Sequence, residues 1–503
     1  MCGIVGYIGN KPAVDILLDG LEQLEYRGYD SSGIAVKCPE EIKVYKAEGK
    51  LKNLREELAP HAYEISKSTL GIGHIRWATH GAPTVVNAHP HTCGCGKLVV
   101  VHNGIIENYK ELKAELEAKG CKFRSQTDTE TVAHLVALIY GEVKDLTKAV
   151  QMATKRLEGA YALCIMHNDE PNKLVATKRN APLVVGVGEN EYYVASDVPA
   201  IIKHTNKAIY IKDNQVVTLT PNSLKLEDEF GGEIIPKVEV LPWEPVALSK
   251  MGFKHFMLKE IHEQPDVIRN ILIGKLHTSD SPIVLDEVKL TKEHLRKLNR
   301  IQVIACGTSL HAAMVGKYII ESFCGIPVDV EASSEYIYRK TVTDEHTLVI
   351  GVSQSGETAD TLTAIKQAKS KGSHVLIITN RPDSTMAREA DSLIPVSAGI
   401  EVSVAATKSY IAQLTSFYLL ALYMAEIKES MPTKELNDIK AEMLVLPQKI
   451  EQILAHKEGI QACARKYANT RDFIYIARGI NYPTALEGAL KLKEISYINA
   501  TGY

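Results

Sequence analysis

Cys2 is the residue near the start of the chain with the greatest capacity for covalent chemistry. A cysteine is nucleophilic as the thiolate, and an unperturbed thiol with a pKa of about 8.5 is mostly protonated at neutral pH. Removal of Met1 would give Cys2 a free α-amino group, a base with an ordinary pKa of about 8. One residue would then supply both nucleophile and base for acyl transfer. The first six residues alone favour a plainer interpretation, a small residue entering a buried strand.

Acyl transfer at Cys2 needs groups that stabilise an oxyanion and hold an amino-acid substrate. Asn103 offers a side-chain amide, and Gly104 offers a backbone N–H, for the oxyanion. Arg76 can grip an α-carboxylate in a bidentate fork, and Asp128 can hold an α-ammonium group. Each of these residues, taken singly, is better explained by a loop hydrogen bond.

A second chemical pattern, Ser-Gln-Ser-Gly-Glu-Thr, occupies residues 353–358, between a predicted buried strand and a predicted helix. Backbone N–H groups and the positive end of the helix dipole attract anions at such a junction. Three hydroxyl groups add donors, and Gly356 allows a ligand to approach closely. We favour a phosphate-binding loop here over a plain helix cap.

Glu487, Lys491 and Glu494 share one face of a predicted helix, because they stand at positions i, i+4 and i+7. The spacing alone favours a solvated stripe of salt bridges. A carboxylate beside a cation can also move a proton between adjacent carbons of a sugar.

Cys93-Gly94-Cys95 follows two histidines and invites comparison with a metal site. The spacing is too tight for the usual cysteine knuckle, and no second cysteine pair follows. We expect a loop here and no bound metal.

The composition is that of an ordinary globular protein: 503 residues, a net charge of −3, 24% charged and 45% hydrophobic residues. No long Lys/Arg run points to nucleic acid. The nine cysteines are scattered, and no secretory signal pattern opens the chain, so we expect a cytoplasmic location. Residues 409–425 lack charge but include polar residues, and we expect a buried core or interface helix there and no membrane span.

The elements that must position these residues change character along the chain. Residues 1–240 show short strand-like runs with segregated helices, which predicts an α+β sandwich. Residues 241–300 read as a proline-containing linker and a leading helix. Residues 301–430 alternate strands and helices, which predicts a doubly wound parallel sheet, and residues 431–503 begin a second such domain. One predicted strand and one helix make no core, so we expect this last domain to be incomplete.

Motifs along the first 130 residues resemble the class II glutamine amidotransferases: MCGIVGYIG, LEYRGYDSSGIAV, HIRWATHG, NAHPH, VVHNGIIENY and QTDTET. KHFMLKEIHEQP, IACGTS, GVSQSGET and ALEGALKLKEISYI resemble the sugar isomerase part of one group of them, the glutamine–fructose-6-phosphate aminotransferases. The resemblance implies an N-terminal-nucleophile sandwich followed by sugar isomerase domains.

The resemblance also implies an activity. L-Glutamine would supply nitrogen to D-fructose 6-phosphate, giving D-glucosamine 6-phosphate and L-glutamate, the first step of UDP-N-acetylglucosamine synthesis. It requires no cofactor, and it implies at least a homodimer, because the family's sugar site is built across two subunits.

The resemblance assigns a role to each candidate residue. Cys2 would be the nucleophile, and Asn103 with Gly104 the oxyanion hole. Trp77 would gate an ammonia channel, and Glu494 would be the isomerisation base. The implied glutamine contacts are Arg76, Thr79, His80 and Asp128. The implied sugar-phosphate contacts are Thr308, Ser309, Ser353, Gln354, Ser355, Thr358, Glu487 and Lys491.

The chain departs from the family in two places. Ala406 stands where the family has a serine, and the histidine loop and lysine tail of the family's sugar site have no counterpart up to Tyr503. We therefore expect a complete glutaminase half and an incomplete synthase half.

Two alternatives stay open. A different amidotransferase, such as the purine-pathway phosphoribosyl enzyme, is disfavoured because no strand ends in paired acidic residues before a Thr/Gly-rich loop. A non-catalytic sugar-phosphate sensor is disfavoured by the full set of glutaminase residues.

Overall fold

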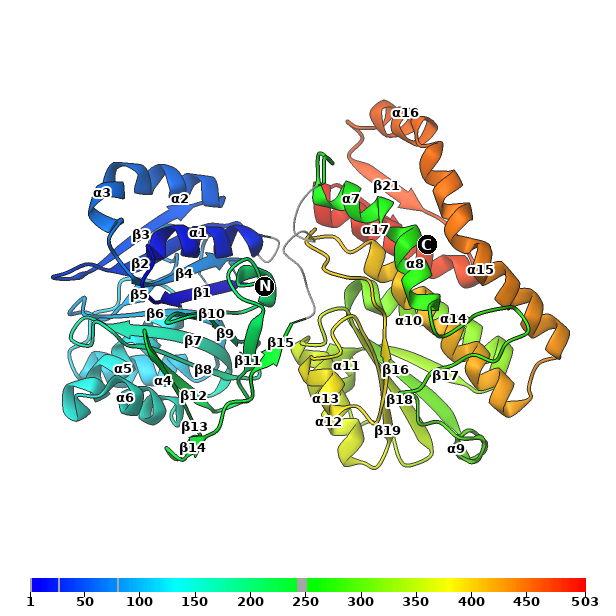
Figure 1. The fold of residues 1–503 in the computed structure, drawn as a ribbon, viewed down its shortest axis with the longest axis horizontal. Helices are drawn as coiled ribbons and strands as arrows, with labels where there is room; N and C mark the ends of the chain where they lie inside the picture. The colour runs from blue at the N-terminus through cyan, green and yellow to red at the C-terminus, as the bar shows by residue number, and fades with distance from the viewer. Residues whose placement is uncertain (1, 26–27, 79–80, 242–250) are drawn as a thin grey trace. The chain divides into compact units, whose positions relative to one another are not determined.

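The structure is a computed structural model that describes residues 2–25, 28–78, 81–241 and 251–503 (Figure 1). It forms two compact units, Met1–Ser249 and Lys250–Tyr503. Each unit is built around its own sheets and core, and each is described by itself.

The first unit contains two antiparallel sheets. Its described strands are β1 (Gly3–Ile8), β2 (Ser31–Lys37), β3 (Ile42–Glu48), β4 (Leu70–Arg76), β5 (His91–Thr92), β6 (Leu98–Ile106), β7 (Gly159–His167), β8 (Leu174–Arg179), β9 (Val184–Val187), β10 (Tyr192–Ala195), β11 (Lys207–Tyr210), β12 (Val216–Thr220), β13 (Ser223–Glu227), β14 (Glu233–Ile234) and β15 (Glu239–Val240). One sheet has the order β15-β11-β9-β10-β1-β4-β2-β3, and the other has the order β14-β13-β12-β8-β7-β6-β5.

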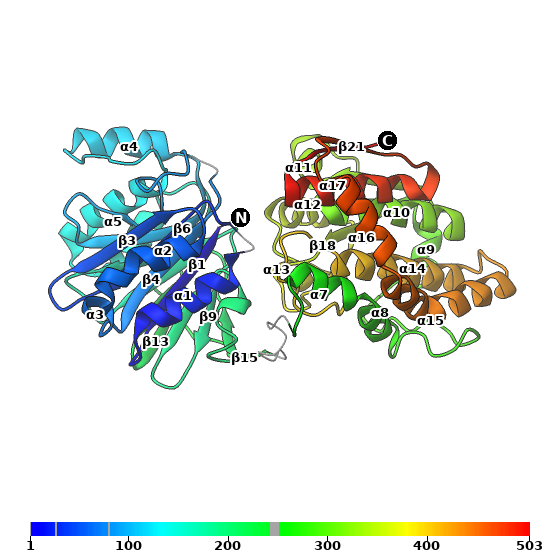
Figure 2. The same cartoon turned by 90° about the horizontal axis from the view of Figure 1, so that it is seen from above.

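Helices cover the outer faces of these two sheets (Figures 1 and 2). They are α1 (Ala13–Gln23), α2 (Leu51–Leu58), α3 (Ala62–Ile65), α4 (Tyr109–Ala118), α5 (Thr129–Val143) and α6 (Leu146–Thr154), with short 3₁₀ turns at Ala59–His61 and Val198–Ala200. α1 packs on β1 and β4, whereas α5 packs on β5 and β6. The predicted α+β sandwich is confirmed.

Strand β6 shows how sequence alternation builds the sandwich. Val99 and Val101 belong to the core between the two sheets, and Leu98 and Val100 belong to the core beneath α5. Successive side chains of a strand point to opposite faces, so a continuous apolar run serves both cores. The same alternation directs Asn103, two residues beyond Val101, toward the facing sheet.

The second unit contains a parallel sheet of five described strands in the order β17-β16-β18-β19-β20. Its elements up to the end of that sheet are α7 (Phe256–His262), α8 (Gln264–Leu272), α9 (Lys292–Lys297), β16 (Arg300–Ala305), α10 (Gly307–Cys324), β17 (Val328–Ala332), α11 (Ser333–Tyr338), β18 (Thr347–Ser353), α12 (Ala359–Ser370), β19 (His374–Thr379), α13 (Thr385–Glu389) and β20 (Ser392–Pro395). The elements that follow are α14 (Lys408–Lys428), α15 (Thr433–Ala455), α16 (Glu458–Lys466), β21 (Asp472–Tyr475), a 3₁₀ turn (Gly479–Asn481), α17 (Tyr482–Ser496) and β22 (Asn499–Gly502).

Helices lie on both faces of the five-stranded sheet, so the predicted doubly wound arrangement is confirmed. One core gathers apolar residues of α8, α10 and α14, and the other gathers those of α11, α12 and α13. β21 and β22 form a separate parallel pair against which α17 packs. Ile474 and Ile476 near this pair are exposed.

The uncharged stretch 409–425 lies within α14. Among the described residues, this one helix is long and apolar enough by length and composition to cross a membrane, yet 67% of its most apolar window is buried inside the unit. α14 packs on α8 and α10. Its burial identifies it as a core helix of the second unit.

Two long helical stretches of the second unit are each divided into two helices. The stretch 254–272 forms α7 and α8, and the stretch 433–467 forms α15 and α16. Pro265 lies at the start of α8, where its missing N–H costs nothing. Helices α2 and α6 and strands β17 and β20 are among the elements that the sequence patterns did not predict.

Candidate active site

Cys2 lies immediately before β1 and is half-buried. The backbone N–H of Trp77 donates to Cys2 Sγ over 3.3 Å, and the Cys2 thiol lies 3.5 Å from the Trp77 carbonyl oxygen. The antiparallel pairing of β1 with β4, in which Gly3 stands opposite Ile75, brings these two residues together. The register of the sheet therefore fixes the position of the candidate nucleophile.

Asn103 reaches Cys2 from the second sheet. Its Nδ2 donates to the Cys2 carbonyl oxygen over 3.1 Å, and the side chain is buried. Gly104 follows with φ of 123°, and a Cβ at this position would lie 2.0 Å from the carbonyl oxygen of Ala160. Only glycine fits this backbone conformation and this close cross-strand approach. The structure thus brings Asn103, one of the two predicted oxyanion donors, to Cys2, and Gly104 follows it directly in β6.

Arg76 is the last residue of β4, and its side chain is buried. The guanidinium donates to the carbonyl oxygens of Gly81 over 3.0 Å and Ala82 over 3.1 Å. Burial lowers the pKa of Arg76, and attraction to nearby Cys2 and Asp128 opposes that shift. Arg76, the predicted substrate clamp, therefore lies close enough to Cys2 for the charge of each to influence the other.

Asp128 is buried at the start of α5. Its Oδ2 accepts a hydrogen bond from the backbone N–H of Ile106 over 2.8 Å, which ties the carboxylate to the end of β6. The ring of Trp77 meets that of Tyr29 edge to face at 5.3 Å. The structure thus places Cys2, Trp77, Arg76, Asn103, Gly104 and Asp128 in one region, whereas Thr79 and His80 lie outside the described residues.

The second candidate site lies at the carboxyl ends of β16 and β18. These strands are parallel neighbours, and the chain continues from them toward opposite edges of the sheet. Open α/β sheets bind ligands in the crevice at such a switch point. Thr308 and Ser309 lie in the first turn of α10, directly after β16, and residues 353–358 connect β18 to α12.

Hydroxyl groups organise the loop at 353–358. Ser353 Oγ accepts from the backbone N–H of Gly356 over 3.0 Å and lies 2.9 Å from Thr358 Oγ1. Ser355 Oγ accepts from the backbone N–H of Glu357 over 3.2 Å. The loop has the strand–turn–helix setting that the sequence predicted for an anion site.

Gln354 and Ser309 are both tied to neighbouring elements. The carbonyl oxygen of Gln354 accepts from the backbone N–H of Asn380 over 3.2 Å. Ser309 Oγ accepts from Gln413 Nε2 over 2.9 Å. Both residues therefore belong to the ordered scaffold of the switch point.

Glu487 is buried on α17, and both of its carboxylate oxygens are engaged. Oε1 accepts from Thr308 Oγ1 over 3.0 Å, and Oε2 lies 2.7 Å from His311 Nδ1. Lys491 Nζ donates to Thr308 Oγ1 over 2.9 Å and to Glu494 Oε2 over 2.6 Å. The stripe predicted on α17 is therefore part of a polar network that reaches α10.

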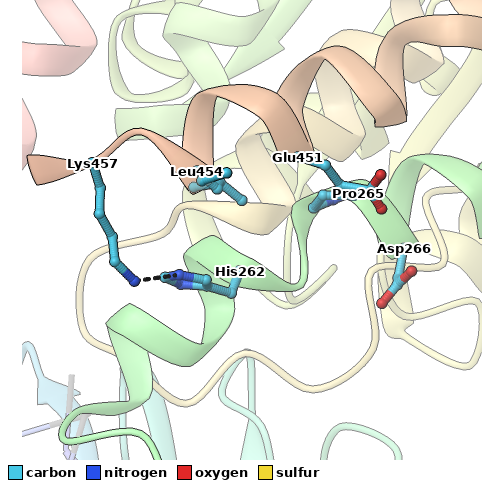
Figure 3. Close-up of a pocket in the computed structure, with 7 residues that line it drawn as sticks. His262, Pro265, Asp266, Glu451, Leu454 and Lys457 are labelled. Atoms are coloured by element: carbon cyan, nitrogen blue, oxygen red, sulfur yellow. Dashed lines mark hydrogen bonds between the residues drawn. The ribbon is translucent and has the colours of Figure 1, made fainter.

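A pocket of about 360 Å³ lies within the second unit (Figure 3). Its lining residues come from α7, α8, α15 and the start of α16: His262, Pro265, Asp266, Glu451, Leu454, Ala455 and Lys457. Lys457 Nζ donates to His262 Nε2 over 3.2 Å, while His262 Nδ1 lies 2.8 Å from the Leu258 carbonyl oxygen. None of the residues lining this pocket is a predicted site residue.

Cys93 and Cys95 lie in the turn between β5 and β6, with their sulfur atoms 2.8 Å apart. Across the described ranges, no group of three or more His, Cys, Asp or Glu side chains is arranged to hold a metal ion.

Comparison with known proteins decides the family. A glutamine amidotransferase domain matches residues 84–203, and a SIS domain matches residues 294–423. The glutamine–fructose-6-phosphate aminotransferase (isomerizing) of Caldanaerobacter subterraneus subsp. tengcongensis is 47% identical over 503 residues, all of this chain and 82% of that protein. The one from Gloeobacter violaceus is 48% identical over 505 residues, with the same coverage. The chain belongs to the glutamine–fructose-6-phosphate aminotransferase (isomerizing) family.

Membership of the glutamine–fructose-6-phosphate aminotransferase family confirms the resemblance seen in the sequence motifs. The chain is an aminotransferase with a glutamine amidotransferase domain. Among solved structures, the C-terminal domain of glucosamine-fructose-6-phosphate aminotransferase from Francisella tularensis is 38% identical, with a TM-score of 0.48, covering 51% of this chain and 71% of that one.

Two histidines of the candidate sites, His74 and His311, have no role that the sequence patterns predict. His74 Nε2 lies 3.0 Å from Asn103 Oδ1, but a lone histidine in an apolar strand reads as a core residue. His311 stands three residues after Thr308 on α10, so it shares a helix face with that residue. That spacing is the signal that could have drawn attention to His311.

Proposed function

We propose that this aminotransferase takes nitrogen from L-glutamine in its first unit and delivers it to D-fructose 6-phosphate in its second. The products would be L-glutamate and D-glucosamine 6-phosphate, the entry to amino-sugar synthesis. The observation that carries the proposal is the pair of hydrogen bonds that place Trp77 and Asn103 against Cys2. These contacts support a role for Cys2 as the nucleophile, with Asn103 beside it as an oxyanion donor.

In the first step, the Cys2 thiolate would attack the amide carbon of glutamine. The α-amino group of Cys2, exposed after removal of Met1, would accept the thiol proton and pass it to the departing ammonia. Negative charge would develop on the amide oxygen, where Asn103 Nδ2 and the Gly104 N–H would stabilise it. Water would then cleave the glutamyl thioester and release glutamate.

Arg76 and Asp128 would hold the glutamine while it reacts. The planar guanidinium suits a carboxylate, and the aspartate suits an ammonium group. Both side chains are buried and anchored by backbone contacts, which keeps them ready for the substrate. Thr79 and His80, which lie outside the described residues, would be further glutamine contacts.

In the second unit, the sugar phosphate would bind at the switch point between β16 and β18. The phosphate ligands would be Ser353, Gln354, Ser355 and Thr358, with Thr308 and Ser309 near the sugar. Glu494 would move the proton between adjacent sugar carbons, with Lys491 and Glu487 holding its charge and position. Trp77 would gate the passage of ammonia from the first unit.

The proposal includes the organisation of the protein. Residues 1–240 would form the glutaminase domain, and 241–300 the linker and leading helix. Residues 301–430 and 431–503 would belong to the first and second sugar isomerase domains. We further propose a homodimer in the cytoplasm.

The test uses the 503-residue protein and its Cys2→Ala variant. We expect wild-type protein to release glutamate from glutamine and Cys2→Ala to lose at least about a thousandfold of that rate, because the nucleophile is gone. Cys463→Ala, which removes an exposed cysteine of the second unit, serves as the matched control and keeps full activity. Glutamate release by Cys2→Ala at the wild-type rate would overturn the proposal. Calorimetry measures the binding of fructose 6-phosphate, and a turnover assay measures its conversion. Binding without conversion would indicate a sugar-phosphate sensor, whereas binding with conversion would indicate an enzyme.

A further inference from the structure

We propose that His74 is a positioning residue that holds the Asn103 amide with its nitrogen toward Cys2. This inference rests on the proposed glutaminase step and identifies a further residue for it. An asparagine amide has nearly the same shape in its two flipped orientations, so shape alone cannot present the donor to the oxyanion. A neighbouring group that can act only as a donor, or only as an acceptor, is needed to select one orientation.

His74 provides such a group. Its Nε2 lies 3.0 Å from the His102 carbonyl oxygen and 3.0 Å from Asn103 Oδ1. A backbone carbonyl only accepts, so Nε2 must carry the proton. The same N–H then faces the amide of Asn103 and selects its oxygen end.

The other end of the Asn103 amide therefore faces the nucleophile. Asn103 Nδ2 donates to the Cys2 carbonyl oxygen over 3.1 Å. Flipping the amide would set two N–H groups against each other at His74 and two oxygens against each other at Cys2. Both hydrogen bonds would become repulsive contacts. In a buried site, where water cannot replace a lost hydrogen bond, such mismatched polar groups have their largest free-energy cost.

The imidazole of His74 is itself held in place. It is fully buried on β4, with Ile4 of β1 opposite it. Its ring stacks on that of His89 at a centroid distance of 4.1 Å and an interplanar angle of 15°. The backbone N–H of His102 donates to His89 Nδ1 over 3.3 Å and so fixes the stacking partner. His74 Nδ1 has no hydrogen-bond partner among the described residues, which leaves the Nε2–H tautomer as the one with partners.

The test compares three variants of the full 503-residue chain in glutamate release. His74→Leu replaces the imidazole with an apolar side chain of similar size that has no hydrogen-bond donor. His74→Gln restores an N–H donor, because the amide nitrogen of glutamine is separated from Cα by the same number of bonds as Nε2 of histidine. His167→Leu, at another buried histidine of the same unit, is the matched control, since residue 167 stands opposite Leu98 at the far end of the β6–β7 pair.

We expect His74→Leu to lower kcat at least about tenfold, approaching the loss of about 10² to 10³ that removal of an oxyanion donor causes. KM for glutamine should stay within about threefold, because Arg76 and Asp128 are unchanged. His74→Gln and His167→Leu should stay within about threefold of the wild-type kcat. A rise in KM with unchanged kcat, or a His74→Gln variant as slow as His74→Leu, would contradict the proposal.

A double-mutant cycle separates positioning from general destabilisation. If His74 acts through Asn103, then His74→Leu costs nothing further in an Asn103→Ala background. An equal loss in both backgrounds would overturn the proposal. Alkylation of Cys2 by iodoacetamide at the wild-type rate checks that the nucleophile is intact. If His74→Leu does not fold, His74→Asn takes its place in the same cycle. The amide of asparagine reaches only as far as the Nδ1 position of histidine and cannot contact Asn103, so we expect the same loss.

Discussion

Acidification is expected to destabilise the first unit through its buried imidazoles. His74, His89 and His91 are each buried, and burial lowers the pKa of each below the ordinary value of 6.5, that of His74 to about 3. Unfolding returns each ring to water, where it titrates normally. Below pH 6.5 the unfolded chain therefore binds more protons than the folded one, and stability falls as the pH falls through that value.

The size of the effect follows from the number of rings. At pH 5.5, one imidazole that stays neutral in the folded state and has an unfolded pKa of about 6.5 costs about 1.4 kcal/mol of stability relative to pH 7.5. Three such rings cost about 4 kcal/mol, which is a large part of the about 5–15 kcal/mol typical of a domain. The stability is fully present above pH 6.5 and is lost progressively below it.

Equilibrium urea unfolding at pH 7.5 and pH 5.5 measures this difference. Trp77 lies in the candidate site of the first unit, so the change in its fluorescence reports the unfolding of that unit. His91→Gln should remove about 1.4 kcal/mol of the pH dependence, and His456→Gln, at an exposed histidine of the second unit, is the control. A difference below about 1 kcal/mol between the two pH values would refute the argument, because the rings would then titrate as they do in water.

Three further substitutions test the candidate sites. Gly104→Ala, whose Cβ would lie 2.0 Å from the Ala160 carbonyl oxygen, should lower kcat for glutamate release at least about a hundredfold, and near-normal kinetics would contradict the assigned oxyanion hole. Gly356→Ala, whose Cβ would lie 2.0 Å from Ser384 Oγ, should weaken calorimetric binding of fructose 6-phosphate at least about tenfold and leave glutamate release unchanged. Unaltered sugar binding would mean that the phosphate lies elsewhere. In the protein expressed at its natural full length, Lys491→Met should abolish amino-sugar formation while glutamate release continues, and a variant that still makes amino sugar at the wild-type rate would remove Lys491 from the site.

Much of the fold could be predicted because its signals are local. The apolar run of β6 and the junction at 353–358 are visible in a few consecutive residues; the junction stands in the structure as predicted, and β6 includes the apolar run but continues to Ile106. The shift from short strand-like runs to alternating strands and helices likewise predicted the two architectures. β17 was missed because it is short, and its residues Val328–Ala332 include two acidic side chains.

The candidate sites depend on contacts between distant residues, which sequence patterns do not specify. Asn103 meets Cys2 through the packing of two sheets, and the tautomer of His74 follows from acceptors that lie far along the chain. His311 pairs with Glu487 across 176 positions. The family resemblance supplied the roles of Cys2 and Asn103, whereas the hydrogen bonds that orient them become visible only in three dimensions.

The most direct measurement of nitrogen transfer uses glutamine labelled with ¹⁵N in its side-chain amide. The protein, expressed at the full length of its natural gene, is incubated with this glutamine and D-fructose 6-phosphate, and the products are analysed by mass spectrometry. The proposed function predicts ¹⁵N-labelled glucosamine 6-phosphate and glutamate in equal amounts, with neither formed by Cys2→Ala. Glutamate and ¹⁵N-ammonium without any labelled amino-sugar phosphate would contradict it.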